Sequence, residues 1–397
     1  MTRNESAMLA AEEASPLGDG AGLAIVTEGV DCGGTERVLQ ALADRFPAAT
    51  IVSNHFPAVM SPDPNAAPWS VGARLVPSGR RKRHFLAPLY ARRLAAAPVG
   101  SARLVVALAG GGGWALAAPI PPGARLLCYS AGLPGALYGK TSLYLRAERL
   151  PLRPLLLAAV PALRSYFQRL MRRPHRLVTN SCASATAIAR VYGRQAEVVH
   201  PPVRTAFFTP APVPKRHFLA VARMVPHKRF DILIDAFRGL DETLVIVGRG
   251  PWLERFRAGA PPNVRFTGWV DDATLRELYR SSHALACPSV EEFGIVMAEA
   301  HACGVPVIAP RAGAAVEIVD DPATGTLLET IDARSLAEAV RSTRGRRFDP
   351  GACRTSAERF AEEEFLVRME AIIAEELGEA VASEGNQPVP VARAASI

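Results

Sequence analysis

Residues 289–308 read SVEEFGIVMAEAHACGVPVI, which sets two carboxylates, Glu291 and Glu299, around a glycine turn and an apolar run. The pattern predicts a loop that enters a helix over 295–302, followed directly by a buried strand over 306–309. The first turn of a helix leaves backbone N–H groups without partners, and such groups bind phosphate. Carboxylates beside a phosphate would repel it unless they accept hydrogen bonds from hydroxyls. A sugar nucleotide offers both chemistries, a diphosphate for the helix and hydroxyls for the two carboxylates.

The size and charge of the chain narrow the class of protein. It has 397 residues, of which 49% are hydrophobic, enough for two domains with separate cores. A net charge of +8 favours anionic partners. The basic clusters at 80–83, 172–173 and 344–347 carry no nucleic-acid-binding motif, so we do not expect nucleic acid as a partner. The six cysteines are scattered without a CxxC pair, so we expect neither a zinc site nor a disulfide framework.

No segment has the composition of a targeting or membrane-spanning sequence. Residues 1–16 contain three glutamates and no apolar core, so we expect no signal peptide there. The apolar tracts 104–118 and 155–160 fall short of the ~20 residues that span a bilayer. A cytoplasmic location is expected. The basic segment 80–83, followed by apolar residues, favours either peripheral contact with the inner face of an anionic membrane or a solvated helix face.

Short β-branched runs alternate with helical stretches, which is typical of an α/β protein with parallel sheets. In the first half we expect strands at 23–27, 50–53, 73–76, 104–108, 126–129, 177–179 and 197–200, and helices at 35–46, 84–96, 156–170 and 183–191. In the second half we expect strands at 218–222, 243–247, 264–267, 283–287, 306–309 and 325–328, and helices at 230–237, 252–258, 273–280, 295–302, 333–342 and 355–377.

A proline-rich stretch divides the chain. Pro210, Pro212 and Pro214 resist regular structure, so residues 206–216 are predicted to be a linker. The full predicted division is a flexible N-terminus (1–20), a first Rossmann-like domain (21–205), the linker (206–216), a second Rossmann-like domain (217–350), a terminal helix (351–378) and a disordered tail (379–397).

Two cations follow the first predicted strand of the second domain. Arg223 and Lys228 lie between that strand and a helix start, where a positive charge without an anionic ligand would be unfavourable. Ligands bind at the carboxyl ends of strands in open α/β sheets. Fixed cations there can stabilise the charge that develops on a diphosphate leaving group, without a metal.

These segments together resemble the retaining GT-B glycosyltransferases, in particular glycosyltransferase family 4 (glycosyl transferases group 1). The family pattern is Pro-Ser, a few residues, Glu-Gly-Phe-Gly, then Glu-Ala and small-Gly-x-Pro-Val-Ile. Here Glu292 replaces the usual glycine before Phe293. Arg223 and Lys228 match the family's Gly-Arg-x-x-x-x-Lys-Gly segment. The resemblance covers residues 22–375.

The resemblance implies an α/β fold of the GT-B type, with two Rossmann-like domains facing each other across a cleft. The first domain would bind the acceptor and the second the donor, and the terminal helix would cross back to the first. Arg223, Lys228 and Glu291 would be catalytic. Further matches are Gly-Gly-Thr-Glu-Arg at 33–37, Val-Gly-Arg-Gly-Pro at 247–251 and Phe-Thr-Gly-Trp-Val at 266–270. The implied donor-binding residues are Gly33, Gly34, Gly248, Gly250, Val270, Phe293, Gly294, Ile295 and Glu299.

The acceptor side departs from the family pattern. Many relatives have His-Thr-Pro shortly after a tyrosine, whereas Ala131 takes the histidine's place here. The loop at 110–113 is four glycines where relatives are serine-rich, which predicts an unusual acceptor pocket. We assign Tyr129, Ser130 and Gly112 to the acceptor side.

The histidines share no metal-ligand spacing and no Asp-x-Asp motif is present, so we expect neither a metal nor a cofactor besides the donor substrate. The leading hypothesis is a retaining transferase that moves a sugar from a nucleotide-diphospho-sugar to a hydroxyl of a lipid-linked glycan, a polysaccharide or a natural product. A sugar-nucleotide epimerase or hydrolase on the same fold and a catalytically impaired binding subunit are the alternatives. The sugar, the base and the acceptor stay open.

Overall fold

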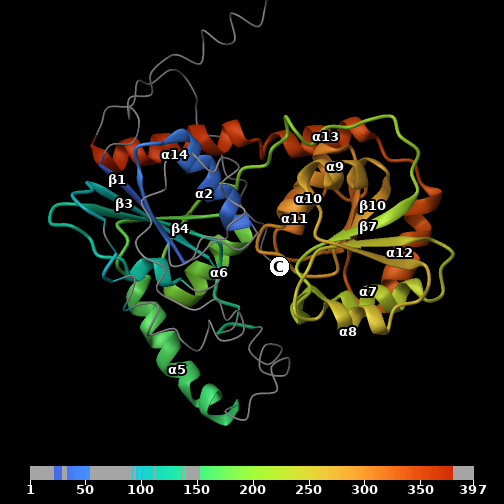
Figure 1. Ribbon diagram of the computed structural model, residues 1–397, viewed down its shortest axis with the longest axis horizontal. Coiled ribbons are helices and arrows are strands. Elements are labelled where there is room, and N and C mark those ends of the chain that lie inside the picture. Colours follow the sequence, from blue (N-terminus) through green and yellow to red (C-terminus); the bar gives the residue numbers. More distant parts are fainter. Residues whose placement is uncertain are drawn as a thin grey trace, which may run out of the picture.

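The computed structural model describes residues 22–28, 34–53, 92, 95–97, 99–110, 113–135, 137–139 and 153–378. Their helices and strands form two lobes, each built around a six-stranded parallel sheet (Figure 1). The prediction of an α/β protein with two Rossmann-like domains is confirmed.

The first sheet has the strand order β2-β1-β3-β4-β5-β6. Its strands are β1 (Leu23–Thr27), β2 (Thr50–Ser53), β3 (Leu104–Ala109), β4 (Arg125–Ser130), β5 (Arg176–Thr179) and β6 (Glu197–Val198). Every residue of β1 and β3 is buried, as in parallel strands whose two faces are both covered. The helical segments of this lobe are α2 (Gly34–Arg45), η2 (Trp114–Ala117), α5 (Arg153–Leu170) and α6 (Cys182–Tyr192).

The second sheet has the strand order β12-β11-β10-β7-β8-β9. Its strands are β7 (His217–Val221), β8 (Leu244–Val247), β9 (Val264–Gly268), β10 (Ser282–Ala286), β11 (Val307–Pro310) and β12 (Gly325–Leu328). The helical segments are η3 (Pro226–Lys228), α7 (Phe230–Phe237), α8 (Leu253–Ala258), α9 (Asp272–Arg280), α10 (Ile295–Ala302), α11 (Ala315–Ile318) and α12 (Ala333–Gly345). In both sheets the strand order reverses beside the first strand of the lobe, which is where α/β sheets bind ligands.

Apart from the terminal helix, the predicted elements agree with the observed ones to within a few residues where the structure describes them. The strands 23–27, 50–53 and 325–328 and the helices 230–237 and 295–302 agree residue for residue. Several predictions lie outside the described residues: the termini 1–20 and 379–397, the strand 73–76, the basic segment 80–83, nearly all of the helix 84–96, and the glycines Gly33 and Gly112.

The end of the chain differs from the prediction. A single helix over 351–378 is wrong, because α13 (Pro350–Glu358) and α14 (Glu362–Leu377) are separate helices. Between these helices the backbone is hydrogen-bonded to Val203. Val203 N–H donates to Phe360 O at 2.9 Å, and Glu362 N–H donates to Val203 O at 3.1 Å. The chain therefore passes between the lobes twice, and the two passages are hydrogen-bonded to each other.

The two terminal helices belong to different lobes. Helix α13 packs on α10 of the second lobe, whereas α14 packs on α2, β3 and β4 of the first (Figure 1). The predicted apolar stripe Phe365, Met369 and Ile372 is buried in the core of the first lobe. Helix α14 thus returns the described part of the chain to the first lobe.

Candidate active site

A buried ion pair joins two of the residues that the sequence predicts to be catalytic. Lys228 ends the η3 turn after β7, and Glu291 lies in the loop between β10 and α10. The Lys228 Nζ atom is 2.7 Å from Oε1 and 2.5 Å from Oε2 of Glu291, and Ser289 Oγ donates to Oε1. The side chains are only 17% and 11% exposed. These contacts hold a cation at the carboxyl end of a central strand.

The charge of Lys228 is maintained by its partner. Burial by itself would lower the pKa of Lys228, but the Glu291 carboxylate outweighs burial and the pKa is raised above its ordinary value. Lys228 is therefore protonated at neutral pH. A preformed cation in a largely buried site can stabilise negative charge that develops during a reaction.

Helix α10 begins directly after this pair. Gly294 precedes its first residue with φ 83°, and a Cβ atom there would overlap the Met297 side chain and lie 3.1 Å from Glu291 Cβ. Glycine is required by both conformation and space. The ion pair and the glycine turn therefore lie at the start of α10, where the sequence predicts a phosphate-binding site, and within the turn Met297 N–H donates to Gly294 O at 2.8 Å. The Phe293 ring is buried instead against His200 and Phe360, with ring centroids 5.7 and 5.3 Å away.

The glycines after β8 are crowded by the loop after β7. A Cβ on Gly248 would overlap the Ala222 carbonyl oxygen, and one on Gly250 would lie 2.6 Å from Met224 O. The loops are hydrogen-bonded, since Met224 N–H donates to Arg249 O at 3.1 Å. Both glycines thus allow two loops to cross at the end of the sheet. The crossing presents Arg223, which is exposed and forms no ion pair with any residue the structure describes.

The segment after β9 holds one group that sequence reasoning missed, Trp269. Trp269 is 50% exposed, and the Arg249 guanidinium lies 5.5 Å from its ring centroid. A large aromatic ring beside the half-buried Val270 could have been noticed as an exposed tryptophan at a strand end. Asp271 caps α9 by accepting a hydrogen bond from Thr274 N–H at 2.7 Å.

Glu299 lies just over one turn into α10 and is only 4% exposed. Its Oε2 atom accepts a hydrogen bond from the Tyr279 hydroxyl at 3.0 Å. Burial raises the pKa of Glu299, and the positive charge of Arg37 from the first lobe acts against that rise. A carboxylate with one oxygen held by a tyrosine can offer the other to a ligand hydroxyl.

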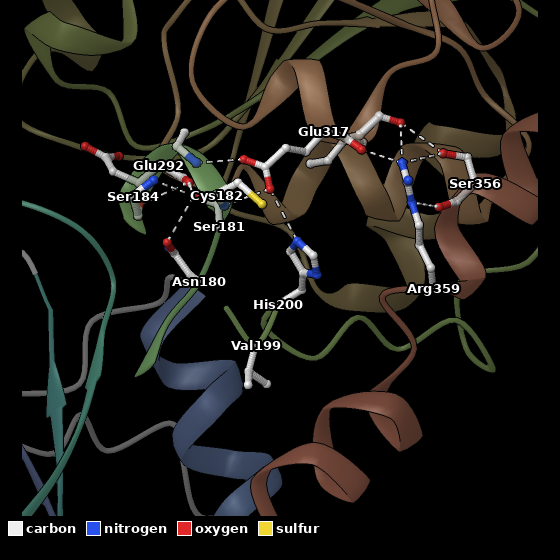
Figure 2. A network of polar contacts seen from close by, with 12 residues as sticks. Asn180, Ser181, Cys182, Ser184, Val199, His200, Glu292, Glu317, Ser356 and Arg359 are labelled. Carbon is white, nitrogen blue, oxygen red and sulfur yellow. Dashed lines mark hydrogen bonds and ion pairs between the residues drawn. The ribbon is translucent and has the colours of Figure 1, made fainter. Parts of the chain in front are cut away.

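Figure 2 shows how Glu317 of α11 connects the lobes. Its carboxylate accepts hydrogen bonds from Cys182 N–H and Ala183 N–H at the start of α6, both at 2.9 Å. His200 Nε2 is 3.3 Å from the same carboxylate, and Arg359 donates to the backbone carbonyl of Glu317. Burial would raise the pKa of Glu317, but His200 and the two amides hold it below its usual value. A carboxylate of the second lobe thus caps a helix of the first.

The lobes also touch at two of the three departures from the family pattern, the loop with Ala131 and the loop with Glu292. Gly132 follows β4 with φ 108°, and a Cβ atom there would lie 2.9 Å from Glu292 Cγ and 3.1 Å from Ser184 Oγ. Ser181 Oγ donates to the Glu292 carbonyl at 2.5 Å (Figure 2). The loop that lacks the histidine and the loop that gains a glutamate therefore pack against each other.

Two residues assigned to the acceptor side have other roles here. The Tyr129 hydroxyl donates to Val199 O at 2.9 Å, and its buried ring packs against Phe365 of α14. Tyr129 belongs to the core, because successive strand residues point to opposite faces of the sheet. Ser130 is also buried, and its Oγ hydrogen-bonds to the backbone of Gly132. It holds the loop that packs against the second lobe.

Sequence reasoning missed an acid in the first lobe. Glu28 directly follows β1, and its Oε1 accepts a hydrogen bond from Trp114 N–H at 2.5 Å. An acid immediately after a fully apolar strand was the available signal. Nearby, Gly34 begins α2, and a Cβ added to it would meet nothing within 4 Å. Among the described residues, no group of three or more His, Cys, Asp or Glu could hold a metal ion.

The arrangement of the lobes has been observed in other proteins. Sucrose-phosphate synthase from Thermosynechococcus elongatus has a TM-score of 0.66 at 20% identity, covering 90% of this chain and 99% of that one. The Anabaena protein HepE, solved with UDP and glucose, gives 0.65 at 18% identity, with 90% and 99% covered. The chain has the GT-B fold.

The sequence comparisons concern mainly the second lobe. Residues 215–343 match the family model Glycosyl transferases group 1. A GDP-mannose-dependent alpha-(1-6)-phosphatidylinositol monomannoside mannosyltransferase of Mycolicibacterium smegmatis is 36% identical over 140 residues, 31% of this chain and 37% of that protein. A D-inositol 3-phosphate glycosyltransferase of Acidothermus cellulolyticus is 34% identical over 210 residues, 44% of this chain and 46% of that protein. The matched part of the chain thus spans less than half the length of these relatives.

Proposed function

We propose that this protein is a retaining glycosyltransferase that uses a nucleotide-diphospho-sugar as donor. The observation that carries the proposal is the buried Lys228–Glu291 pair beside the start of α10. The match of residues 215–343 to glycosyl transferases group 1 supports the same reaction class. The names of the relatives suggest an acceptor that carries an inositol or another polyol, free or in a lipid headgroup.

The diphosphate would lie against the first turn of α10, with Lys228 and the exposed Arg223 facing it. Glu291 would share Lys228 with the incoming phosphate and accept hydrogen bonds from the sugar. As the bond between the sugar and the phosphate breaks, negative charge grows on the leaving oxygen, and the two cations stabilise it. The acceptor hydroxyl attacks from the face that the nucleotide leaves, and its proton passes to the departing phosphate. The anomeric configuration is retained without an enzyme nucleophile.

The first experiment is a donor screen by thermal unfolding. One relative's name specifies GDP-mannose and one structural neighbour was solved with UDP and glucose, so GDP- and UDP-sugars come first and dTDP-sugars serve as comparison. A donor at one hundred times its Kd should stabilise the fold by ~2.7 kcal/mol. The absence of stabilisation by any nucleotide sugar would contradict the proposal.

The second experiment separates the candidate reactions. Nucleotide release from the stabilising donor is measured with and without an acceptor. Release that needs an acceptor indicates transfer, release without one indicates hydrolysis, and binding without release indicates a catalytically impaired subunit. An epimerase would change the sugar while the diphosphate stays attached.

A membrane contact is a separate proposal about location. Within the described part of the chain, no helix is both long enough and apolar enough to cross a bilayer. The basic segment 80–83 would instead bind the surface of anionic vesicles in a salt-dependent way, at ~1 kcal/mol per cation. Replacing Arg80, Arg81, Lys82 and Arg83 by serine should reduce that binding. A wild type that ignores such vesicles at low salt would contradict it.

A further inference from the structure

Arg37 reaches from the first lobe to the second. It lies on α2, and its guanidinium donates to Asp272 Oδ1 of α9 at 2.9 Å. The other oxygen of Asp272 accepts from Arg204, at 2.5 Å, in the segment that connects the lobes. Asp272 is therefore held on both oxygens, and it fixes the position of the Arg37 guanidinium against the second lobe.

Helix α9 links this contact to Glu299, because the helix contains both Asp272 and the tyrosine that binds Glu299. Asp272 and Tyr279 are seven residues apart and so lie on the same face of the helix. The Tyr279 side chain is fully buried, and its hydroxyl donates to Glu299 Oε2 at 3.0 Å. Within the described part of the chain, Glu299 Oε1 accepts no hydrogen bond. Glu299 thus has one oxygen fixed by α9 and one available to a ligand.

Arg37 and Glu299 also interact electrostatically. Burial raises the pKa of Glu299, whereas Arg37 lowers it. In the other direction, burial would lower the pKa of Arg37, but Glu299 and Asp272 raise it. The titratable and charged groups around Glu299 are Arg37 from α2, Arg204 from the connecting segment, Asp272 and Tyr279 from α9, and Cys303 at the end of α10.

We propose that Arg37 is a positioning residue for the ribose of the donor, acting from the opposite lobe through Glu299. The positive charge of the Arg37 guanidinium keeps the Glu299 carboxylate ionised, so that it can accept hydrogen bonds from the ribose hydroxyls. Asp272 fixes the position of Arg37, and Tyr279 fixes the position of Glu299. This inference rests on the proposed function, in which Glu299 binds the ribose. It makes donor affinity depend on the contact between the lobes, although Arg37 itself need not touch the nucleotide.

The test compares nucleotides that differ by one hydroxyl. GDP and UDP are titrated against 2′-deoxy-GDP and 2′-deoxy-UDP by calorimetry. One hydrogen bond to a carboxylate should give the wild type a preference for the ribonucleotide of about tenfold. Glu299→Gln should reduce this preference strongly, and Arg37→Ala should reduce it to a similar extent. Arg37→Lys should retain part of it, because the charge remains.

A matched control lies on the same helix. Arg45 of α2 forms an ion pair with Glu370 of α14, within the first lobe. Arg45→Ala removes a cation and a salt bridge from α2 without touching the second lobe, so it should keep the full ribose preference. If Arg37→Ala does not fold, Arg37→Gln takes its place, because it removes the charge and keeps much of the side chain.

The pH dependence of GDP binding distinguishes an electrostatic role of Arg37 from a purely structural one, because a structural role would leave the pH dependence unchanged. A protonated Glu299 loses acceptor capacity, so affinity should fall as the pH drops through the pKa of Glu299. Without Arg37 that pKa is higher, and the fall should occur at higher pH in Arg37→Ala than in the wild type. Arg45→Ala should follow the wild-type curve.

The possible outcomes distinguish a failure of the role proposed for Arg37 from a failure of the ribose site at Glu299. If Glu299→Gln loses the ribose preference while Arg37→Ala keeps both the preference and the wild-type pH curve, the role of Arg37 is refuted and the proposed function stands. If neither GDP nor UDP binds the wild type, or if Glu299→Gln keeps the preference, the ribose site itself fails.

Discussion

The two lobes share one architecture and differ in what stands at the carboxyl ends of their strands. In the second lobe these ends carry buried, partnered charges: Lys228 with Glu291, and Glu299 with Tyr279. In the first lobe the loop after β4 begins with the small residues Ala131 and Gly132, and Gly132 packs against Glu292 of the second lobe. The comparison teaches that the two buried charge partnerships named here belong to the second lobe, whereas the first lobe meets the second through Arg37 and the start of α6.

The largest effect is expected from the charged site itself. Lys228→Ala should lower kcat by at least about a hundredfold, because a contact that strengthens in the transition state is worth ~3 kcal/mol. It also leaves Glu291 buried without its cation, which should destabilise the fold by roughly 3–5 kcal/mol. Steady-state kinetics and denaturant unfolding measure the two effects.

A double variant separates them. Lys228→Met with Glu291→Gln removes both charges and should recover most of the stability while activity stays lost. Recovery of activity in that variant would show that the second lobe's charges are structural, and the contrast between the lobes would disappear.

The second prediction concerns the small residues of the first lobe. Gly132→Ala introduces a Cβ 2.9 Å from Glu292 Cγ at a φ of 108°. We expect the lobes to be pushed apart and kcat to fall about tenfold, since a misplacement of ~1 Å is costly in rate. Glu292→Gly in the same chain removes one obstacle and should restore part of the activity. If Gly132→Ala is as active as the wild type, the first lobe's small residues do not serve closure.

Much of the fold could be predicted because local patterns determine it. Strand β1 and helix α10 follow from apolar runs bounded by turn residues, and both agree residue for residue. The break between α13 and α14 could not be predicted, because its cause is Val203, a residue distant in sequence. The position of Tyr129 in the core could have been predicted, since successive residues of a strand point to opposite faces of the sheet and Ser130 is the next residue of β4.

The residues of the candidate site could be predicted from the sequence, but the contacts between them could not. The sequence patterns indicate Lys228 and Glu291 separately, but the ion pair joins residues 63 positions apart, which no local pattern predicts. Gly248 fits a motif associated with ligand approach, whereas the structure shows crowding by the neighbouring loop at Ala222. Contacts between the lobes, such as that of Glu317 with α6, depend on how two independent sheets are placed.

A smaller effect is expected from the Glu317 contact. Glu317→Ala leaves two amides at the start of α6 without their acceptor, which should cost about 1–3 kcal/mol of stability. The pKa of Glu317 is depressed in the folded state, so its contribution is fully present above its unfolded-state pKa and is lost as pH falls through the folded-state pKa. Thermal unfolding from neutral to acidic pH should show a steeper loss in the wild type than in Glu317→Gln. Parallel curves would mean that this carboxylate does not hold the lobes together.

The smallest expected effect is that of metal removal. We propose that Lys228 and Arg223 take the place of a metal at the leaving group, so a chelator should leave kcat unchanged within about twofold. Activity that disappears with a chelator and returns with Mg²⁺ would show that the cations of the second lobe are insufficient.

The central claim, that the second lobe's buried charges bind the diphosphate of a sugar nucleotide, is tested most directly by one titration. GDP and UDP are titrated into the wild type and into the folded Lys228→Met, Glu291→Gln double variant. Our account predicts micromolar-range binding of at least one nucleotide to the wild type and a loss of at least about a hundredfold in the double variant. Equal affinity in the two proteins would contradict it.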